Sequence, residues 1–333
     1  MMRMPAASKW VLCACLPWGL SVDDAHAQDA DPPVAVADRH DTANAFLELL
    51  EEDERAAALR PFDHDSRHGW SFFPVKRDAL RIGDLDAEER AALDAFLRVA
   101  LSEAGRAKLA DVLVVEAVSD RGGGVVTGPE EYHVRFFGPV SRTGAWSWRL
   151  EGHHVALNQT LVDGRVISAT PSFLGSAPIR NREGLEPLRR EIGIAQTLTR
   201  SLEPSLRDQA VVAEVPREIV SGMTVEWAMP KAKGVTMASL PEPGRALLRA
   251  LAAEHVAIHA DDVSRPFFES WDATAPDQIR FAWFGSLEKD GPHAYRLQGP
   301  GWVMEYVNFQ AGATHVHTVW RNREGEFIPI AGR

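Results

Sequence analysis

The sequence predicts an α+β fold in which helices are segregated from two related antiparallel β-meanders. A run of landmarks recurs about 147 residues later without a gap, which indicates an internal duplication. The hydrophobic period also changes, from a helical one in the N-terminal part to an alternating one from Glu131 onwards. The landmarks are Phe137-Gly138, Gly144, Trp148-Arg149-Leu150 and Gly152 in the first copy, and Phe284-Gly285, Gly291, Tyr295-Arg296-Leu297 and Gly299 in the second.

Residues 1–27 are expected to be a signal peptide. An apolar run from Trp10 to Val22 follows two basic residues and is too short for a permanent membrane span. Small residues at Ala25 and Ala27 then suit cleavage after Ala27. We therefore expect a secreted, periplasmic protein whose mature chain has no integral membrane segment. A retained anchor, or a lipoprotein built on Cys15, is the alternative.

Composition limits the chemistry of the mature chain. Both cysteines, Cys13 and Cys15, lie in the expected signal peptide, so a metal site must use His, Asp or Glu ligands. The net charge of −11 argues against nucleic acid or an anionic membrane as a partner. Neither the composition nor the charge indicates an oligomeric state.

Residues 28–40 are expected to be a disordered linker, and residues 41–125 a helical N-terminal part. Its helices are expected to start at Asp41 or Thr42, at Asp84 or Asp86, and at Ser102; the first ends near Leu59, and the third at Gly122-Gly123-Gly124. Residues 126–333 hold the duplicated β-units, 131–171 and 278–321, with helices near 185–202 and 243–259 between them. This region is expected to form one compact domain with residues 41–125.

The register of the hairpins decides which side chains meet. In the second β-unit, a three-residue loop containing Gly312 is expected, and it pairs Glu305 with His317. The same loop in the first unit pairs Asn158 with Ser168. On this register Glu305 occupies the position that corresponds to Asn158.

A histidine cluster on the second unit is the main candidate site. His315 and His317 are two residues apart on a strand, so both imidazoles project from one face. With Glu305 opposite, they offer two nitrogens and one oxygen to a divalent metal ion such as zinc, copper or iron. By alternation His154 is a fourth ligand or a general base, and His153 faces the other side and orients a ligand from behind. The alternative is an ordinary hydrogen-bonded histidine network.

Other residues are assigned supporting roles around that site. We expect Asn158 to support the ligands, and Arg321 or Arg135 to stabilise a developing anion. Trp146, Trp148 and Arg67 are candidate substrate contacts; an arginine packed under an aromatic ring is the alternative for Arg67.

These residues also carry a resemblance. The motifs concerned are Phe136-Phe137-Gly138, Trp146 and Trp148, Gly152-His153-His154 with Asn158, Thr170-Pro171-Ser172-Phe173-Leu174-Gly175, and His315-Val316-His317-Thr318-Val319-Trp320-Arg321. Through them the chain resembles the family called domain of unknown function 3500, over nearly the whole mature length. Ala79 stands where that pattern has a glycine. The resemblance supports the fold and the site and implies no reaction.

The sequence therefore leads to three functions. The first is a metal-dependent enzyme acting on a small-molecule or glycan-like substrate, with hydrolysis slightly preferred over oxidation. The second is a non-catalytic periplasmic protein that binds metal or carbohydrate, the latter against Trp146, Trp148 and Trp302. The third is a structural domain with a histidine network.

Overall fold

A computed structural model of the chain describes residues 38–117, 127–287 and 291–327. These residues combine helices with a sheet of thirteen strands. The predicted signal peptide, most of the predicted linker and the glycine turn at 122–124 lie outside the described residues. Among the helices that the structure describes, none has the length and apolar character needed to cross a membrane.

The first half of the described chain runs from residue 39 to residue 176. Short 3-10 turns at Asp65–Arg67, Ile82–Asp84 and Pro129–Glu131 connect its elements. The elements are α1 (Arg39–Leu49), α2 (Glu52–Ala58), β1 (Leu59–Arg60), β2 (Leu80–Arg81), α3 (Ala87–Ala100), α4 (Glu103–Ala117), β3 (His133–Phe137), β4 (Ala145–Gly152), β5 (Val155–Val162), β6 (Arg165–Ser168) and β7 (Ser172–Ser176).

The second half runs from residue 189 to residue 322. A 3-10 turn at Met237–Ser239 again follows a short strand. The elements are α5 (Arg189–Ser201), α6 (Pro204–Ala210), β8 (Val211–Val212), β9 (Val235–Thr236), α7 (Glu242–Val256), α8 (Asp261–Ala273), β10 (Arg280–Gly285), β11 (His293–Gln298), β12 (Trp302–Phe309), α9 (Gln310–Ala313) and β13 (His315–Asn322).

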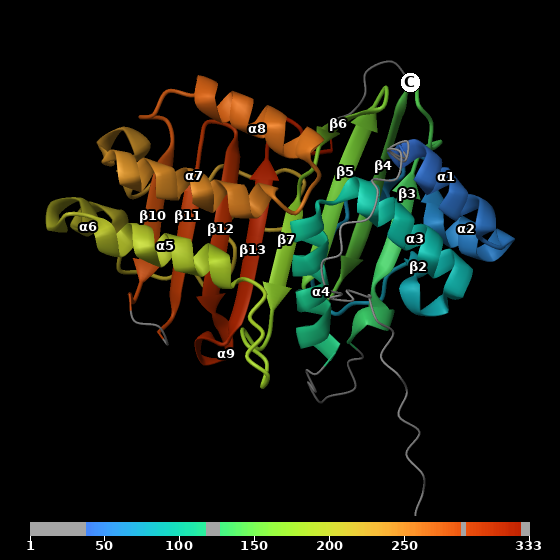
Figure 1. Cartoon of the computed structure of the whole chain (residues 1–333), viewed down its shortest axis with the longest axis horizontal. Helices are drawn as coiled ribbons and strands as arrows, with labels where there is room; N and C mark the ends of the chain where they lie inside the picture. The colour runs from blue at the N-terminus through green and yellow to red at the C-terminus, as the bar shows by residue number, and fades with distance from the viewer. Residues whose placement is uncertain (1–37, 118–126, 288–290, 328–333) are drawn as a thin grey trace, which may run out of the picture. The chain divides into compact units, whose positions relative to one another are not determined.

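The two halves repeat one order of elements within the same sheet. The main path of strands is β1-β3-β4-β5-β7-β13-β12-β11-β10-β8 (Figure 1). In each half two helices lead to a short parallel strand at the sheet edge, β1 or β8, and a short antiparallel strand, β2 or β9, follows. The expected antiparallel meanders, β3-β4-β5 and β10-β11-β12-β13, are present. They lie side by side, because β7 pairs with β13.

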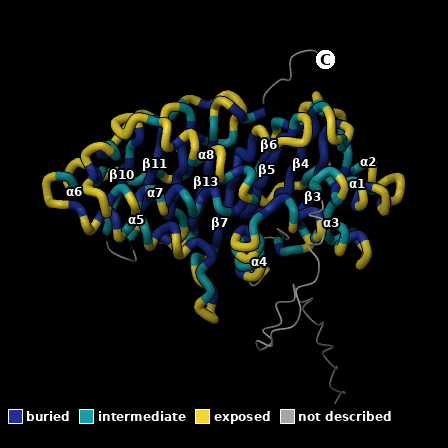
Figure 2. Tube along the Cα trace, turned by 45° about the horizontal axis from the view of Figure 1, so that its top comes forward, coloured by how far each residue is buried: buried dark blue, intermediate teal, exposed yellow. Residues whose placement is uncertain are grey.

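The helices cover one face of this sheet. In Figure 1, α5 and α7 cross in front of β10–β13, and α3 and α4 lie in front of the first meander. Alternate strand residues such as Trp148, Leu157 and Met304 bury their side chains against these helices. Figure 2 shows the central strands buried and the exposed segments on outer helices and turns.

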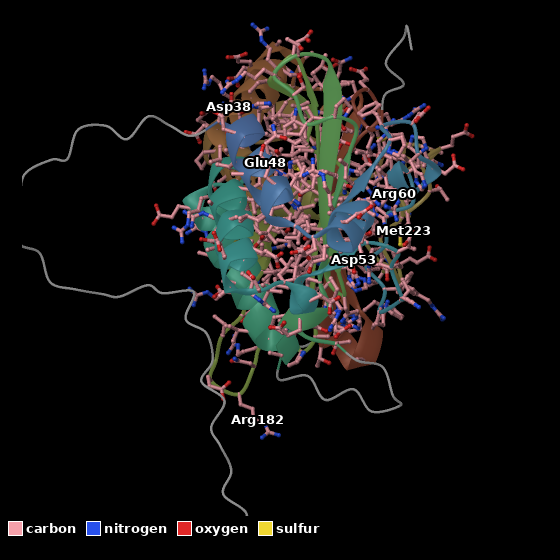
Figure 3. All side chains as sticks on the ribbon, turned by 90° about the vertical axis from the view of Figure 1, so that its right-hand side faces the viewer. Asp38, Glu48, Asp53, Arg60, Arg182 and Met223 are labelled. Atoms are coloured by element: carbon pink, nitrogen blue, oxygen red, sulfur yellow. The ribbon has the colours of Figure 1, made fainter. Side chains whose placement is uncertain are left out.

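Irregular segments cover the opposite face. Viewed along the sheet edge in Figure 3, Met223 from the segment 213–230 lies on the side away from the teal helices. Residues 61–78 also cover this face, and the Phe72 ring stacks on Phe173 of β7 with centroids 4.0 Å apart. This aromatic stretch before β2 therefore covers a second apolar cluster, to which Trp70 and Phe72 belong.

Local sequence signals explain most helix starts. Asp86 caps α3, because its carboxylate accepts hydrogen bonds from the amides of Glu88 and Glu89. The Ser102 hydroxyl accepts a hydrogen bond from the backbone amide of Gly105 and so caps α4, as predicted. The first helix differs from the prediction: Asp38 caps it, and it ends at Leu49 before a separate α2.

The predicted hairpin registers are wrong by two residues. Glu305 pairs with Val319, and His317 pairs with Val307, because the turn runs to Thr314 and contains left-handed residues at Ala311, Gly312 and Ala313. In the first half, a two-residue turn of Asp163 and Gly164 and a bulge after Thr160 pair Ser168 with Thr160, not with Asn158. The faces are nevertheless kept, since a shift of two residues preserves alternation.

Candidate metal centre

The turn between β4 and β5 supplies two imidazoles. Gly152 pairs with Val155, so His153 and His154 form the turn itself, with φ of 68° at His154. The expectation that these neighbours face opposite sides of a strand is therefore wrong. Both rings lie together, with centroids 3.8 Å apart.

Glu116, near the end of α4, holds both rings. Its Oε1 lies 2.5 Å from Nδ1 of His153, and its Oε2 lies 2.9 Å from Nδ1 of His154. Burial opposes ionisation of this carboxyl, but the hydrogen bonds from the two imidazoles outweigh it and lower the pKa of Glu116 to about 2. Burial is also the main reason why the pKa of His154 lies well below its usual value.

Strand β13 supplies two further imidazoles. His315 and His317 alternate onto the face away from the helices, where their ring centroids are 4.6 Å apart. Both carboxylate oxygens of Glu218, from the segment 213–230, lie 2.8 Å from Nδ1 of His317. The Gln310 amide donates to the same carboxylate and holds it in place.

Three imidazoles from the two halves meet at the junction of β7 and β13. Nε2 of His154 lies 2.8 Å from Nε2 of His315. The candidate ligand atoms of His154, His315 and His317 all lie within 4.8 Å of one another. His154 is fully buried, His317 is 4% exposed and His315 is half-buried. This group has the donor atoms and the spacing to hold a metal ion.

Gly175 makes room for this arrangement. It pairs with His317 across the junction. A Cβ atom at this position would lie 2.7 Å from Cδ2 of His154 and 3.0 Å from Cδ2 of His317. Any larger side chain must therefore displace one of the two imidazoles.

A second group of donors lies beside the first. Glu116, His153 and His154 also have candidate ligand atoms within 4.8 Å of one another. In the three-histidine group, however, a carboxylate faces Nδ1 of His154 and another faces Nδ1 of His317. A carboxylate behind the ring is the usual partner of a metal-binding histidine, because it fixes the ring and its tautomer. The three-histidine group therefore fits a metal ion better.

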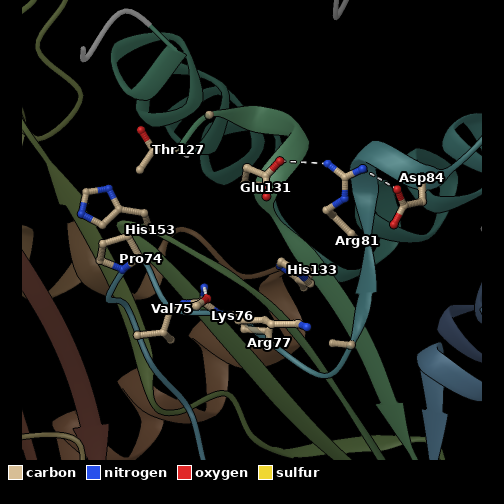
Figure 4. Close-up of a pocket in the computed structure, with 12 residues that line it drawn as sticks. Pro74, Val75, Lys76, Arg77, Arg81, Asp84, Thr127, Glu131, His133 and His153 are labelled. Carbon is tan, nitrogen blue, oxygen red and sulfur yellow. Dashed lines mark hydrogen bonds and ion pairs between the residues drawn. The ribbon is translucent and has the colours of Figure 1, made fainter. Parts of the chain in front are cut away.

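A cavity of about 530 Å³ reaches this region at His153. It lies between β2, the start of β3 and residues 74–77 (Figure 4). Figure 4 shows Arg81 on its wall, paired with both Glu131 and Asp84. His133 and Arg77 complete its inner side.

The remaining predicted site residues lie outside both groups. Glu305 accepts hydrogen bonds from Arg296 and from the amides of Val220 and Ser221. Arg321 is bound by Glu326 and by backbone carbonyls, so its guanidinium is not directed to the histidines. The other positions are as follows: Asn158 contacts Arg149, Arg135 contacts Ser66, Arg67 packs over Phe62, and Trp146 and Trp148 are fully buried in the core on the helix side.

Sequence reasoning missed the two carboxylates. Glu116 had a readable signal: it follows Val112 by one helical turn and so lies on the apolar face of α4, where an acidic residue needs a partner. Glu218 had none, because the segment 213–230 has no regular period.

Comparison with known proteins adds a family and no activity. Neither a curated protein nor a solved structure matches the chain. A family model described as "Protein of unknown function (DUF3500)" matches residues 33–328, which is most of the sequence. The chain therefore belongs to the DUF3500 family of proteins of unknown function.

Proposed function

We propose that this chain is a secreted, periplasmic metal-dependent enzyme. His154, His315 and His317 would bind the ion, and Glu116 and Glu218 would orient the first and the last of these rings. The observation that carries the proposal is the pair of carboxylates facing Nδ1 of His154 and of His317, which leaves Nε2 of each ring for the ion. Zinc, copper and iron all accept such imidazole ligands.

This ligand set is the set expected from sequence without Glu305. His154, expected from sequence as a fourth ligand or a general base, is kept as a ligand, whereas both Glu305 oxygens accept hydrogen bonds elsewhere. His153 then borders the cavity beside the ion and is placed to exchange a proton with a bound molecule. Arg321 and Arg135 have other partners, and we assign them no part in the reaction.

Hydrolysis is the simplest reaction for this centre. Three protein ligands leave a coordination position for water, and a bound divalent ion lowers the pKa of that water towards neutrality. An oxidative reaction at copper or iron uses the same ligands and ranks just below it. The small-molecule or glycan-like substrate would approach through the cavity at His153.

We further propose that the two halves arose by duplication and that the centre is formed at their junction. The repeated element order from α1 to β7 and from α5 to β13 supports this origin, as do the equally spaced landmarks. The first half would contribute His154 and Glu116, and the second half His315, His317 and Glu218.

Metal analysis of chain purified without a histidine tag tests the proposal. We expect about one ion per chain, and at least a tenfold loss of affinity for His317→Ala and Glu116→Gln. Gly175→Ala should lower metal affinity in a folded protein, since its Cβ displaces an imidazole. His40→Ala is the control and should keep the ion, because the His40 ring contacts Asp41 and Asn44 and not the three-histidine group. Absence of metal under every loading condition would leave only the structural histidine network.

A metal-binding protein without catalysis is the second candidate. Full burial of His154 favours it, because a deeply buried ion exchanges its ligands poorly with a substrate. Assays of the metal-loaded chain with ester, amide, phosphoester and glycoside substrates, and with oxidase substrates, separate the two. Turnover lost in His317→Ala supports the enzyme, whereas stoichiometric metal without turnover supports the binding protein.

A further inference from the structure

A second cavity, of about 670 Å³, lies on the helix side of the sheet. Its walls come from α5, the segment after β7, strands β11 and β12, and the turn after β12. His293 pairs with Asn308 across these strands, and Tyr306 lies on the same face within the helix-side core. His317 lies on the other face, with Val307 and Val319. The sheet therefore separates this cavity from the candidate metal centre.

Two buried acceptors in the cavity wall have no hydrogen-bond partner among the residues that the structure describes. Nδ1 of His293 lies 2.7 Å from the carbonyl oxygen of Gly291, so Nδ1 carries the proton and Nε2 presents a lone pair. That Nε2 atom has no hydrogen-bond partner among the described residues, although His293 is only 2% exposed. Oδ1 of Asn308, which is 1% exposed, has none either. An unpartnered buried acceptor destabilises the fold, so a molecule that donates hydrogen bonds here removes that cost.

Both acceptors are neutral groups. Burial lowers the pKa of His293, so its imidazole stays uncharged at neutral pH. The carboxylate lining the cavity is Glu186, which is 2.5 Å from Arg180 in an ion pair. An ammonium group at the acceptors would thus find no charge to balance it, whereas a hydroxyl group needs none. The inner wall therefore favours hydroxyl donors.

The rim of the cavity carries excess positive charge. Arg189 and Arg200 line it on α5 and are exposed, and Arg180 is balanced by Glu186. This excess occurs in a chain with a net charge of −11. Arg200, at the far end of α5, donates to the carbonyl oxygen of Leu287. Arg189 is therefore the guanidinium that suits a carboxylate, which accepts two parallel hydrogen bonds from one arginine.

We propose that this cavity binds a small polyhydroxylated carboxylate, such as a sugar acid. Its hydroxyl groups donate to Nε2 of His293 and Oδ1 of Asn308, and its carboxylate accepts from Arg189. The site does not depend on the metal centre, because no candidate ligand of that centre lines it.

Calorimetric titration of the full chain with D-glucuronate tests the proposal, with D-glucose and acetate as probes that each carry half of the required groups. Glucuronate should bind at least tenfold more tightly than either. Arg189→Gln should weaken it at least threefold. Arg190→Gln is the matched control. Arg190 is next to Arg189 in the chain, but its guanidinium pairs with Glu254, so this variant should bind glucuronate as the wild type does.

Two wall variants extend the test. His293→Phe and Asn308→Leu should each lower the affinity for glucuronate at least tenfold. His293→Phe keeps a ring between Trp283 and Tyr306 and removes an unpartnered acceptor, so its melting temperature should not fall. If one variant does not fold, the other still decides the matter.

Three results would overturn the proposal. The first is no measurable binding of glucuronate by the wild type. The second is equal affinity in the wall variants and the wild type. The third is loss of glucuronate binding in His317→Ala, which would place the anion at the metal centre; this variant should leave affinity unchanged.

Discussion

Corresponding positions in the two halves carry the same arginine and different partners. Arg149 pairs with Asn158 across β4 and β5, and Arg296 pairs with Glu305 across β11 and β12. Each guanidinium donates its Nε to that partner, at 2.7 Å and 3.1 Å. The partners differ because the groups facing them differ.

A backbone carbonyl faces Asn158, and two backbone amides face Glu305. The Asn158 amide donates to the carbonyl of Pro171 at 2.7 Å, a contact that a carboxylate cannot make. The Glu305 carboxylate accepts from the amides of Val220 and Ser221. The side chain at this position is thus fixed by the irregular segment that covers it as well as by the arginine beside it.

This difference changes the charge balance of the two halves. In the second half, Arg296 and Arg321 are each paired with a buried carboxylate, Glu305 and Glu326. In the first half, Arg149 has Glu151 only at 3.7 Å. Nearby Arg67 is also buried, and burial together with the charge of Arg149 lowers the pKa of Arg67 to about 10. The first half therefore tolerates more uncompensated positive charge than the second.

Glu305→Gln should produce the largest effect on stability. It leaves Arg296 buried without a counter-ion and turns an amide group towards the amides of Val220 and Ser221, so we expect a loss of about 3–5 kcal/mol in the free energy of unfolding. Urea denaturation measures it, with the exposed Glu324→Gln as control. A loss below about 1 kcal/mol would show that charge balance does not distinguish the halves. The folded fraction should keep its metal, since Glu305 is not among our proposed ligands.

Acid should destabilise the fold through two buried histidines, His255 near the end of α7 and His259 just after it. Burial lowers the pKa of His255 and His259 to about 3, compared with about 6.5 in an unfolded chain. Between these values the unfolded chain binds protons that the folded chain does not, so stability is complete above pH 6.5 and is lost as pH falls towards 3. At pH 4.5 each histidine should remove about 2–3 kcal/mol.

Comparison of urea unfolding at pH 7.5 and 4.5, in chelator, checks this effect. His259→Gln loses the contacts to Gln159 and Ser172, and its stability should therefore be lower at pH 7.5. Its further loss on acidification should nevertheless be smaller than that of the wild type by about 2 kcal/mol. An unchanged pH dependence would mean that His259 takes up protons equally in both states.

Asn158→Asp should have the smallest effect. The new carboxylate gains attraction to Arg149 but faces the Pro171 carbonyl without a proton, so we expect a net loss of about 1–2 kcal/mol. Asn158→Ala removes the amide without adding charge and separates these contributions. An aspartate variant more stable than the wild type would indicate that the missing counter-ion matters more than the carbonyl contact.

The sequence was sufficient for features that depend on local periodicity. Alternation placed His315 and His317 on one face, and capping residues located the starts of α3 and α4. Equal spacing aligned Asn158 with Glu305. Features that depend on tertiary contacts could not be predicted from the sequence. Left-handed Ala311 and Ala313 lengthen a turn that glycine alone does not reveal, and left-handed His154 closes another.

The candidate site divides in the same way. Three of its imidazoles were named from sequence, yet their meeting required β7 to pair with β13, a contact between distant segments. Glu218 contacts His317 from an aperiodic segment that folds over the sheet, so no sequence pattern could predict this contact. Both missed carboxylates, Glu116 and Glu218, contact Nδ1 of an imidazole. Tertiary packing, rather than local sequence, brings them to these rings.

The junction of β7 and β13 makes the proposed ion a cross-link. His154 and His317 lie on opposite sides of the junction between β7 and β13, so separation of these two strands must pull the two imidazoles apart. Binding would then resist separation of the halves much as a covalent bridge does, in a mature chain expected to have no cysteine. The free energy of unfolding should consequently rise with the concentration of free ion. In chelator, strands β7 and β13 should be the first to separate.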